Sequence, residues 1–323
     1  MTRYVSTRLI ESLLVLLVMS FVIYMLIGLM PGDPADMMIA GDPHITSADV
    51  ARIKALYGLD QPLYSRYLAW LGSVLSGNFG SSRLHLRPVL DVMGPFLANS
   101  LLLMGLSFSL SVAIAIPAGV YAALKPHSKL DNAINMLCFA GISVPVFWLA
   151  LMLMMMFAVK LGWLPAGGIS TPGIGGVADR LSYLALPVAT LTLSNIGHYT
   201  RFMRAAMIET LRQDYVRTAR AKGAGPSRVV WRHAFRNALI PVVTILALSF
   251  GSLFSGALVT ETMFAYPGMG KMIYDAVMGN DYNLALVGLL FATLLTLGGN
   301  LLADLAYAWL DPRISYGSGE ARR

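Results

Sequence analysis

Six long apolar runs constrain this 323-residue chain more than any other feature of its sequence. A helix needs about 20 apolar residues to cross a bilayer. The runs cover residues 9–30, 97–124, 132–161, 181–202, 238–258 and 282–310. They are continuously apolar and do not alternate, which excludes a transmembrane barrel and leaves helices as the way to satisfy the backbone in lipid. The sequence therefore predicts an all-α membrane protein with six transmembrane helices.

Charge content and the start of the chain agree with this class. Only 13% of residues are charged, against about a quarter in an ordinary soluble domain. Arg3 and Arg8 precede the first apolar run, as in a secretory signal. That run is too long for a signal peptide, and the helix-stopping string Pro31-Gly-Asp-Pro34 follows it in place of a cleavage site. We expect an uncleaved first transmembrane helix over residues 1–30.

A polar segment over residues 31–96 separates the first run from the rest. Within it, Ser47–Leu56 and Tyr64–Leu75 have helical amphipathic spacing, and Gly77–Ser82 reads as a loop. The amphipathic helices and their tyrosines suit either a docking platform for a soluble partner or packing against a second membrane subunit. Residues 97–312 form the predicted five-helix core, and residues 313–323 form a polar tail.

The distribution of charge predicts the orientation. Six spans place both termini on one side, and assigning the charged residues accordingly gives that side a positive excess, while the other side is slightly negative. Cytoplasmic loops carry the excess of Lys and Arg in membrane proteins. We therefore expect both termini in the cytoplasm and the segment 31–96 on the outer, periplasmic side.

The loop over residues 204–237, between the fourth and fifth runs, is basic and helix-prone on both sides of a break at Gly223, Gly225 and Pro226. Most helix–helix connections have about 2–8 residues, so this one is long for a plain connector. Two interpretations remain open. It is either a positively charged cytoplasmic loop with no further role or a short helix over Arg217–Pro226 that contacts a cytoplasmic partner, with Gly223 at a turn that needs positive φ.

This loop resembles the segment by which permease subunits of ABC importers bind their ATPase. With Gly223 at the position of the family glycine, Arg217-Thr-Ala219 stands where the family has Glu-Ala-Ala. Arg217 in place of Glu and Arg236 in place of Pro depart from the general pattern. The string from Asp214 to Pro241 is instead similar to the dipeptide/oligopeptide/nickel branch of the family. Further strings that resemble this branch are Pro31–Ala35, Gly58–Tyr64, Gly141–Pro145, Phe264–Gly270 and Leu310–Ile314.

The resemblance implies the first permease of a pair in an ATP-driven importer for peptides, glutathione or nickel chelates, working by alternating access. It implies a second homologous permease, two ATPase subunits, a periplasmic or lipid-anchored binding protein and a place in the bacterial inner membrane. It leaves open which of these solutes is carried. The ATPase-coupling residues that it implies are Arg217, Thr218, Ala219, Arg220, Ala221, Lys222, Gly223, Ala224 and Gly225.

No catalytic, cofactor or metal motif is expected in this chain. Gly270-Lys271 lacks the earlier Gly and the following Ser or Thr of a phosphate-binding loop, so ATP and Mg²⁺ are expected on the partner ATPases. The histidines are scattered, and the lone Cys138 excludes a disulfide framework. A channel or a secondary transporter without an ATPase partner is the alternative function, and a membrane enzyme would need a cluster of catalytic groups.

Three residues are candidates for the substrate pathway. Glu261 and Tyr266 fall at the outer end of the fifth run, and His198 falls near the cytoplasmic end of the fourth. Ionisable residues at membrane depth are often functional. The alternative for His198 is an interior histidine with its hydrogen bonds satisfied, and for Met154–Met156 it is packing.

Overall fold

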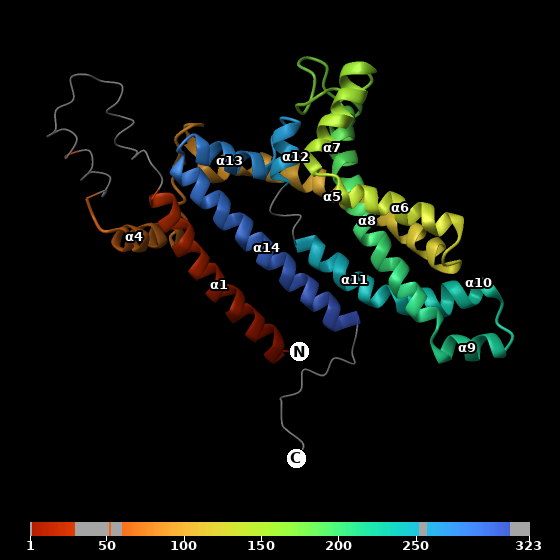
Figure 1. Ribbon diagram of the computed structural model, residues 1–323. Coiled ribbons are helices and arrows are strands. Elements are labelled where there is room, and N and C mark those ends of the chain that lie inside the picture. Colours follow the sequence, from red (N-terminus) through yellow and green to blue (C-terminus); the bar gives the residue numbers. More distant parts are fainter. Residues whose placement is uncertain (1, 30–51, 53–59, 252–256, 311–323) are drawn as a thin grey trace.

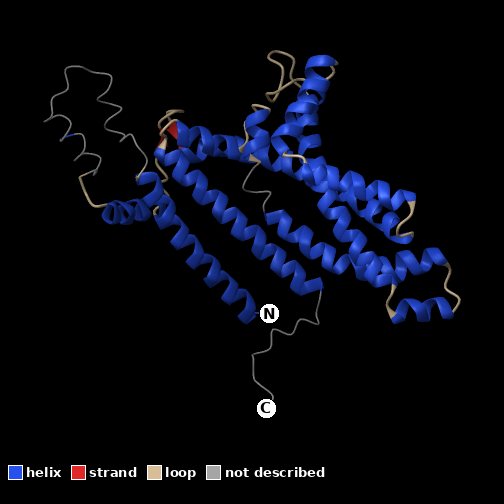
Figure 2. Ribbon diagram, viewed as in Figure 1, coloured by secondary structure: helices blue, strands red, loops and turns tan. Residues whose placement is uncertain are grey.

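The computed structural model describes residues 2–29, 52, 60–251 and 257–310 (Figure 1). The expected helix Ser47–Leu56 and the tail 313–323 lie outside the described residues. Nearly everything described is helical (Figure 2). The elements in chain order are α1 (Thr2–Gly28), α4 (Leu63–Leu75), β1 (Ser81–Ser82), β2 (Arg87–Pro88), α5 (Val89–Leu124), α6 (Lys129–Ser143), α7 (Val146–Leu153), the π-helix η1 (Met154–Lys160), α8 (Val177–Leu211), α9 (Asp214–Ala221), α10 (Pro226–Arg228), the π-helix η2 (Val229–Ala234), α11 (Phe235–Gly251), α12 (Leu258–Met263), α13 (Met269–Met278) and α14 (Tyr282–Leu310).

The helical membrane class is confirmed by the long apolar helices. Three described segments are long and apolar enough to span a bilayer: Ser6–Gly28 in α1, Val89–Leu124 in α5 and Tyr282–Leu302 in α14. A bent pair over Lys129–Lys160 makes a fourth candidate. Leucines along α1 are largely exposed, as expected of a helix that faces lipid.

The third predicted run is not one straight helix. Residues 132–161 were expected as a single span, but α6 and the α7–η1 helix meet at an angle of 102°. The break falls at Val144-Pro145. Val144 has extended backbone, with φ −85° and ψ 125°, because the ring of a following proline disfavours the helical conformation of the residue before it.

The outer segment also differs from its predicted bounds. The helix expected over Tyr64–Leu75 is confirmed as α4. The core was expected to start at residue 97, but α5 already begins at Val89. The expected loop Gly77–Ser82 ends in a two-residue strand, which pairs antiparallel with β2 in the register Ser81–Pro88 and Ser82–Arg87. This short ladder joins the outer segment directly to the start of α5.

The helices pack into three apolar clusters around α5 and α8, which lie against each other. One cluster joins α1, the start of α5, α13 and α14. A second joins the ends of α5 and α8 to η2 and α11, and a third joins α5, α7, α8 and α12. Figure 1 places the N-terminal end of α1, the C-terminal end of α14 and α9 on one side of the molecule, with α4, α12 and α13 on the other.

Candidate functional site: the α9 segment and two polar networks

The expected helix between the fourth and fifth runs is present as α9, with shifted bounds. A helix over Arg217–Pro226 was expected, but α9 runs from Asp214 to Ala221. The exposed Asp214 carboxylate lies in the first turn and accepts a hydrogen bond from Arg217 Nη1 at 3.1 Å. A negative charge at a helix N-terminus is favourable because it complements the helix dipole.

Gly223 ends this helix by its backbone conformation. Its φ is +82°, in the left-handed region that glycine adopts without penalty. The Ala224 N–H donates to the Ala219 carbonyl at 3.1 Å, and the Gly223 N–H donates to the Arg220 carbonyl at 2.9 Å. These two bonds form a Schellman motif, which satisfies carbonyls left free at a helix end. A Cβ at Gly223 would meet no atom within 4 Å. Glycine is therefore favoured here by its backbone conformation and not by a lack of space for a side chain.

α9 packs on one face and leaves the other open. Val216 is fully buried, Ala219 is partly buried, and the helix contacts η2. These two positions are one turn apart, so they share a face. Most of the predicted coupling residues are exposed: Arg217, Thr218, Arg220, Ala221, Lys222, Gly223 and Gly225. The helix is therefore seated on the body of the chain with most of its basic residues at the surface.

On the opposite side of the molecule, Glu261 lies at the centre of a buried hydrogen-bond network. Its side chain has no exposed surface. Oε1 accepts from Ser100 Oγ at 2.5 Å and from the Ala257 N–H at 3.2 Å, and Oε2 accepts from the Lys271 N–H at 2.9 Å. Ser100 Oγ in turn accepts from the Met269 N–H at 2.7 Å. The carboxylate thus fastens α5, α12 and the start of α13 together.

Gly268 makes room for that carboxylate. A Cβ built at Gly268 would lie 2.2–2.6 Å from the carboxyl atoms of Glu261. No side chain can occupy that space unless Glu261 moves, because real Cβ contacts are not this short. The Glu261 side chain and the glycine therefore fit together as a pair.

Tyr266 extends the same network. Its hydroxyl donates to the Asn99 carbonyl at 3.2 Å, and Asn99 Nδ2 donates to the Pro267 carbonyl at 2.9 Å. Burial, with the negative charge of Glu261 nearby, raises the pKa of Tyr266 to about 12, so the phenol keeps the proton that it donates. Both Glu261 and Tyr266 are buried. Contact between either side chain and a passing solute would therefore require this network to open.

His198 lies elsewhere and is exposed. The interpretation as a satisfied interior histidine is wrong for this chain. The side chain borders a cavity between α6 and α8, together with Asn135, Phe139 and Arg201. No group of three or more His, Cys, Asp or Glu side chains that could hold a metal occurs in the part of the chain that the structure describes.

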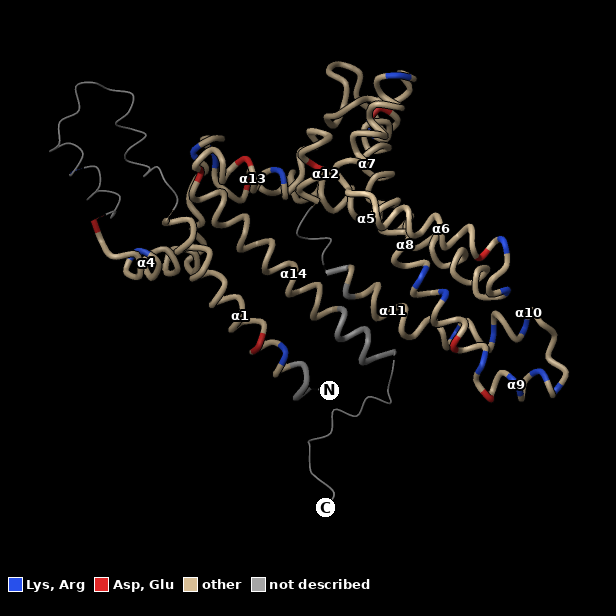
Figure 3. Tube along the Cα trace, viewed as in Figure 1, with Lys and Arg blue, Asp and Glu red and all other residues tan. Residues whose placement is uncertain are grey.

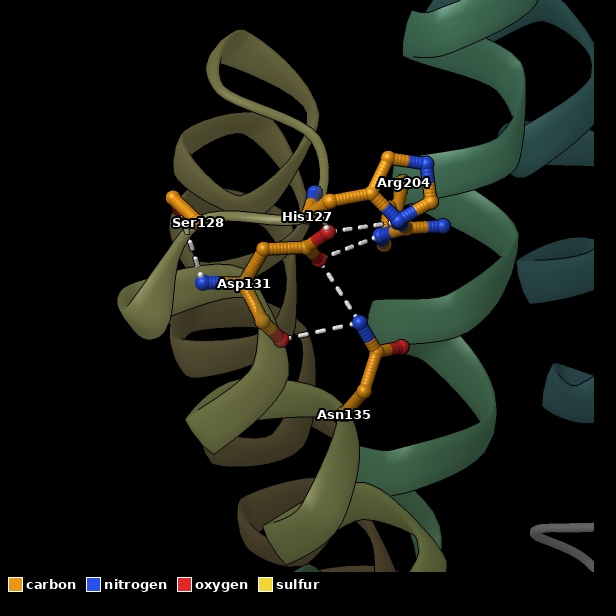
Figure 4. Close-up of polar contacts among 5 residues, drawn as sticks. All are labelled: His127, Ser128, Asp131, Asn135 and Arg204. Carbon is orange, nitrogen blue, oxygen red and sulfur yellow. Dashed lines mark hydrogen bonds and ion pairs between the residues drawn. The ribbon is translucent and has the colours of Figure 1, made fainter.

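A second polar network, which the sequence did not suggest as a site, fixes the start of α6 to α8 (Figure 4). The Arg204 guanidinium donates from Nε to Asp131 Oδ1 at 2.6 Å and from Nη2 to Oδ2 at 2.7 Å. The Asp131 carboxylate also accepts from the His127 N–H at 2.8 Å and from Asn135 Nδ2 at 2.6 Å. Asp131 is 1% exposed. This bidentate pair joins the first turn of α6 to α8, and both oxygens of the buried carboxylate accept hydrogen bonds.

One sequence signal did point to part of this network. Ser128-Lys-Leu-Asp131 has the spacing of a capping box. Ser128 Oγ accepts from the Asp131 N–H at 3.2 Å, as the box requires. The Asp131 carboxylate bonds to the His127 N–H in place of the usual reciprocal N–H. Nothing in the spacing indicates Arg204, which lies 73 residues further along the chain.

Comparison with known proteins identifies the family. Residues 115–316 match the model of the binding-protein-dependent transport system inner membrane component, and residues 1–89 match the model of its N-terminal part. The chain is 39% identical over 318 residues to the oligopeptide transport system permease protein AppB of Bacillus subtilis, covering 98% of this chain and 100% of the relative. It is 35% identical over 335 residues to the dipeptide transport system permease protein DppB of Alkalihalophilus pseudofirmus, covering 98% and 100%.

A third relative gives the same result. The di/tripeptide transport system permease protein DppB of Pseudomonas aeruginosa is 36% identical over 315 residues, covering 91% of this chain and 93% of the relative. The matches extend over the membrane helices, the outer segment and α9 alike. The chain therefore belongs to the family of binding-protein-dependent transport system inner membrane components and is a membrane permease subunit of an ABC importer.

Proposed function

We propose that this chain is the first permease of a pair in an importer of peptides or related small solutes. It receives solute from a periplasmic or lipid-anchored binding protein and releases it to the cytoplasm by alternating access. The names of three relatives, which are oligopeptide, dipeptide and di/tripeptide transport system permease proteins, support the peptide class.

The observation that carries the proposal is the geometry of α9. It is a short helix with most of its basic residues exposed, closed by a glycine in the left-handed conformation. Arg217, Arg220 and Lys222 can donate charge-assisted hydrogen bonds to acidic or carbonyl groups. We assign the segment from Arg217 to Gly225 as the surface that contacts a separate ATPase subunit. ATP and Mg²⁺ belong to that partner, and this chain has no part in hydrolysis.

The continuity of α8 supplies a route from α9 to the rest of the permease. α8 has 35 residues, about 50 Å at 1.5 Å per residue. At one end it leads into α9 through two residues, and toward the other end it contacts α7 and α12. A rigid helix of this length transmits a displacement of α9 to the opposite face of the bilayer. Movement of the ATPases would thereby reach the α12 region, where Glu261 and Tyr266 lie.

The proposed topology has six spans, with both termini and α9 in the cytoplasm of a bacterium. Figure 3 shows Lys and Arg gathered around α9, α10 and the adjoining ends of α8 and α6. The ends of α1 and α14 lie on that same side (Figure 1). This arrangement agrees with the excess of basic residues that cytoplasmic loops carry.

The substrate pathway is proposed to run from the α12–α13 side to the α9 side. Glu261 and Tyr266 would act on it by holding the start of α13 against α5, so that the outer end opens only when this network rearranges. His198, the third candidate, is exposed beside the cytoplasmic half of α8 and borders the cavity between α6 and α8, so its place on the pathway depends on whether solute or lipid occupies that cavity.

Reconstitution tests the whole proposal. The chain is co-expressed with its neighbouring permease, two ATPases and binding protein, purified, and placed in vesicles loaded with ATP and Mg²⁺. Uptake of labelled di- and oligopeptides should depend on ATP and on the binding protein. Peptide uptake by this chain without ATPase subunits would support a channel or secondary transporter and overturn the proposal. ATP-dependent uptake of a different solute would remove only the peptide assignment.

A further inference from the structure

A cavity of about 500 Å³ opens between α6 and α8, close to the end of α8 that leads into α9. Asn135 and Phe139 line it from α6, and His198, Arg201 and Arg204 line it from α8. His198 and Arg201 are one turn apart on α8, so both face the same space. The cavity is therefore a polar pocket with an aromatic wall.

The charge of this pocket is positive. Asp131 already neutralises Arg204 through two hydrogen bonds. Arg201, by contrast, forms no ion pair with any carboxylate in the described part of the chain, and no Asp or Glu lines the cavity. Its guanidinium carbon lies 4.7 Å from the centre of the Phe139 ring. A cation held over an aromatic face with no carboxylate partner is suited to bind an anion.

We propose that this pocket binds the phosphate group of an acidic phospholipid in the cytoplasmic leaflet. The proposal uses the orientation argued above and is independent of which solute is transported. The N–H groups of an arginine lie in the plane of its guanidinium, so stacking on Phe139 leaves them able to form a bidentate pair with phosphate. Asn135 and His198 add further hydrogen-bonding groups at the same pocket.

The surroundings favour a lipid as the source of the phosphate. Two aromatic side chains that line the pocket are largely exposed, Phe139 of α6 at 53% and Phe202 of α8 at 46%. A free anion gains nothing from these apolar side chains, whereas the acyl chains of a lipid bury them. Basic pockets between transmembrane helices on the cytoplasmic side bind anionic head groups for this combination of reasons.

The test compares lipid retention by the intact importer complex. Wild-type and Arg201→Gln complexes are reconstituted in nanodiscs of phosphatidylcholine with a minor fraction of phosphatidylglycerol, and the phosphatidylglycerol retained per complex is measured by native mass spectrometry. Loss of one basic residue at an anionic leaflet should lower retention roughly fivefold. The matched control is Arg180→Gln, at the other end of α8, which should leave retention unchanged.

Three results would overturn the proposal. Equal retention by the wild type and Arg201→Gln would show that something other than lipid occupies the pocket. Displacement of the retained lipid by millimolar inorganic phosphate would identify a site for free anions. A raised KM for peptide uptake in Arg201→Gln, with retention unchanged, would assign the pocket to the solute. If Arg201→Gln yields no complex, Arg201→Lys takes its place, because a point charge cannot form the bidentate pair; it should retain less lipid than the wild type, and equal retention would again refute the proposal.

Discussion

Ser100 on α5 donates its hydroxyl to the Glu261 carboxylate at 2.5 Å, across 161 positions of sequence. The same carboxylate accepts the backbone N–H groups of Ala257 and Lys271. A carboxylate accepts at both oxygens, whereas an amide accepts at only one. Replacement of Glu261 by an amide therefore sets an NH₂ group against a backbone N–H.

The Glu261→Gln variant should lower the free energy of unfolding by about 1–3 kcal/mol, the cost of leaving a buried polar group unsatisfied. Thermal unfolding of the purified complex in detergent measures the change. Asp275→Asn is the control, because Asp275 forms an exposed pair with Lys271 on α13, and such pairs contribute about 0–1 kcal/mol. Equal melting temperatures for the two variants would show that the hydrogen bonds of Glu261 do not stabilise the protein.

Substitutions at Gly223 should show whether ATPase binding depends on the left-handed backbone conformation at this position. Gly223→Val places a β-branched residue at φ +82°, a genuine outlier for such a side chain. We expect it to lower co-purification of the ATPase subunits while membrane insertion persists. Gly223→Asn should retain the subunits, because asparagine tolerates the left-handed region.

Gly94, near the start of α5, supplies the control for this experiment because it lies outside the assigned ATPase surface. It is helical, and a Cβ there also meets no atom within 4 Å. Gly94→Ala should therefore behave like the wild type, whereas Gly223→Ala should weaken the end of α9. If all four variants bind the ATPase equally, the basic α9 segment has no part in coupling.

The Asp131–Arg204 pair should respond asymmetrically to removal of its partners. Arg204→Gln leaves a carboxylate that is 1% exposed without its cation, whereas Asp131→Asn leaves an arginine side chain that is 23% exposed and can reach water. Breaking a buried pair costs about 3–5 kcal/mol, and Arg204→Gln should approach that range while Asp131→Asn costs less. In thermal unfolding, the double variant should lose less than the sum of the single losses. Additive losses would mean that the pair contributes nothing as a unit.

Cysteine labelling should establish the topology. Cys138 is buried and is the only cysteine of the chain. The Cys138→Ala variant therefore has no thiol that could react with the label. In that background, Ser73→Cys on α4 should react with an impermeant maleimide on intact cells. Ser227→Cys on α10 should react only after permeabilisation. Reaction of both on intact cells would contradict the proposed orientation.

Helices that depend on the residues of their own segment were predicted from the sequence. Apolar runs predicted α1, α5 and α14, and amphipathic spacing predicted α4. Gly223 was expected at a turn that needs positive φ, and it ends α9 in that conformation. The bounds of α9 were less accurate, because the helix begins at Asp214, where a carboxylate suits the first turn.

Relationships over long distances in the chain could not be predicted. The sequence contains Pro145, which marks a break, but the angle of 102° depends on how α6 and α7 each pack against α8. Asp131 and Arg204 were two charges on one predicted side of the membrane, and only the packing of α6 on α8 makes them partners. The burial of Glu261 likewise depends on α5, which precedes it by more than 130 residues.

The packing of α1 has a consequence for the order in which the protein is assembled. α1 precedes every other described helix, yet among them its largest contact is with α14, the last one described. Membrane helices insert individually and associate afterwards. α1 therefore stays in lipid without its main packing partner while the helices between are synthesised, and it reaches its final position only after α14 has entered the membrane. Truncation within α14 should accordingly leave α1 inserted but unassociated, a substrate for the proteases that remove orphan membrane segments.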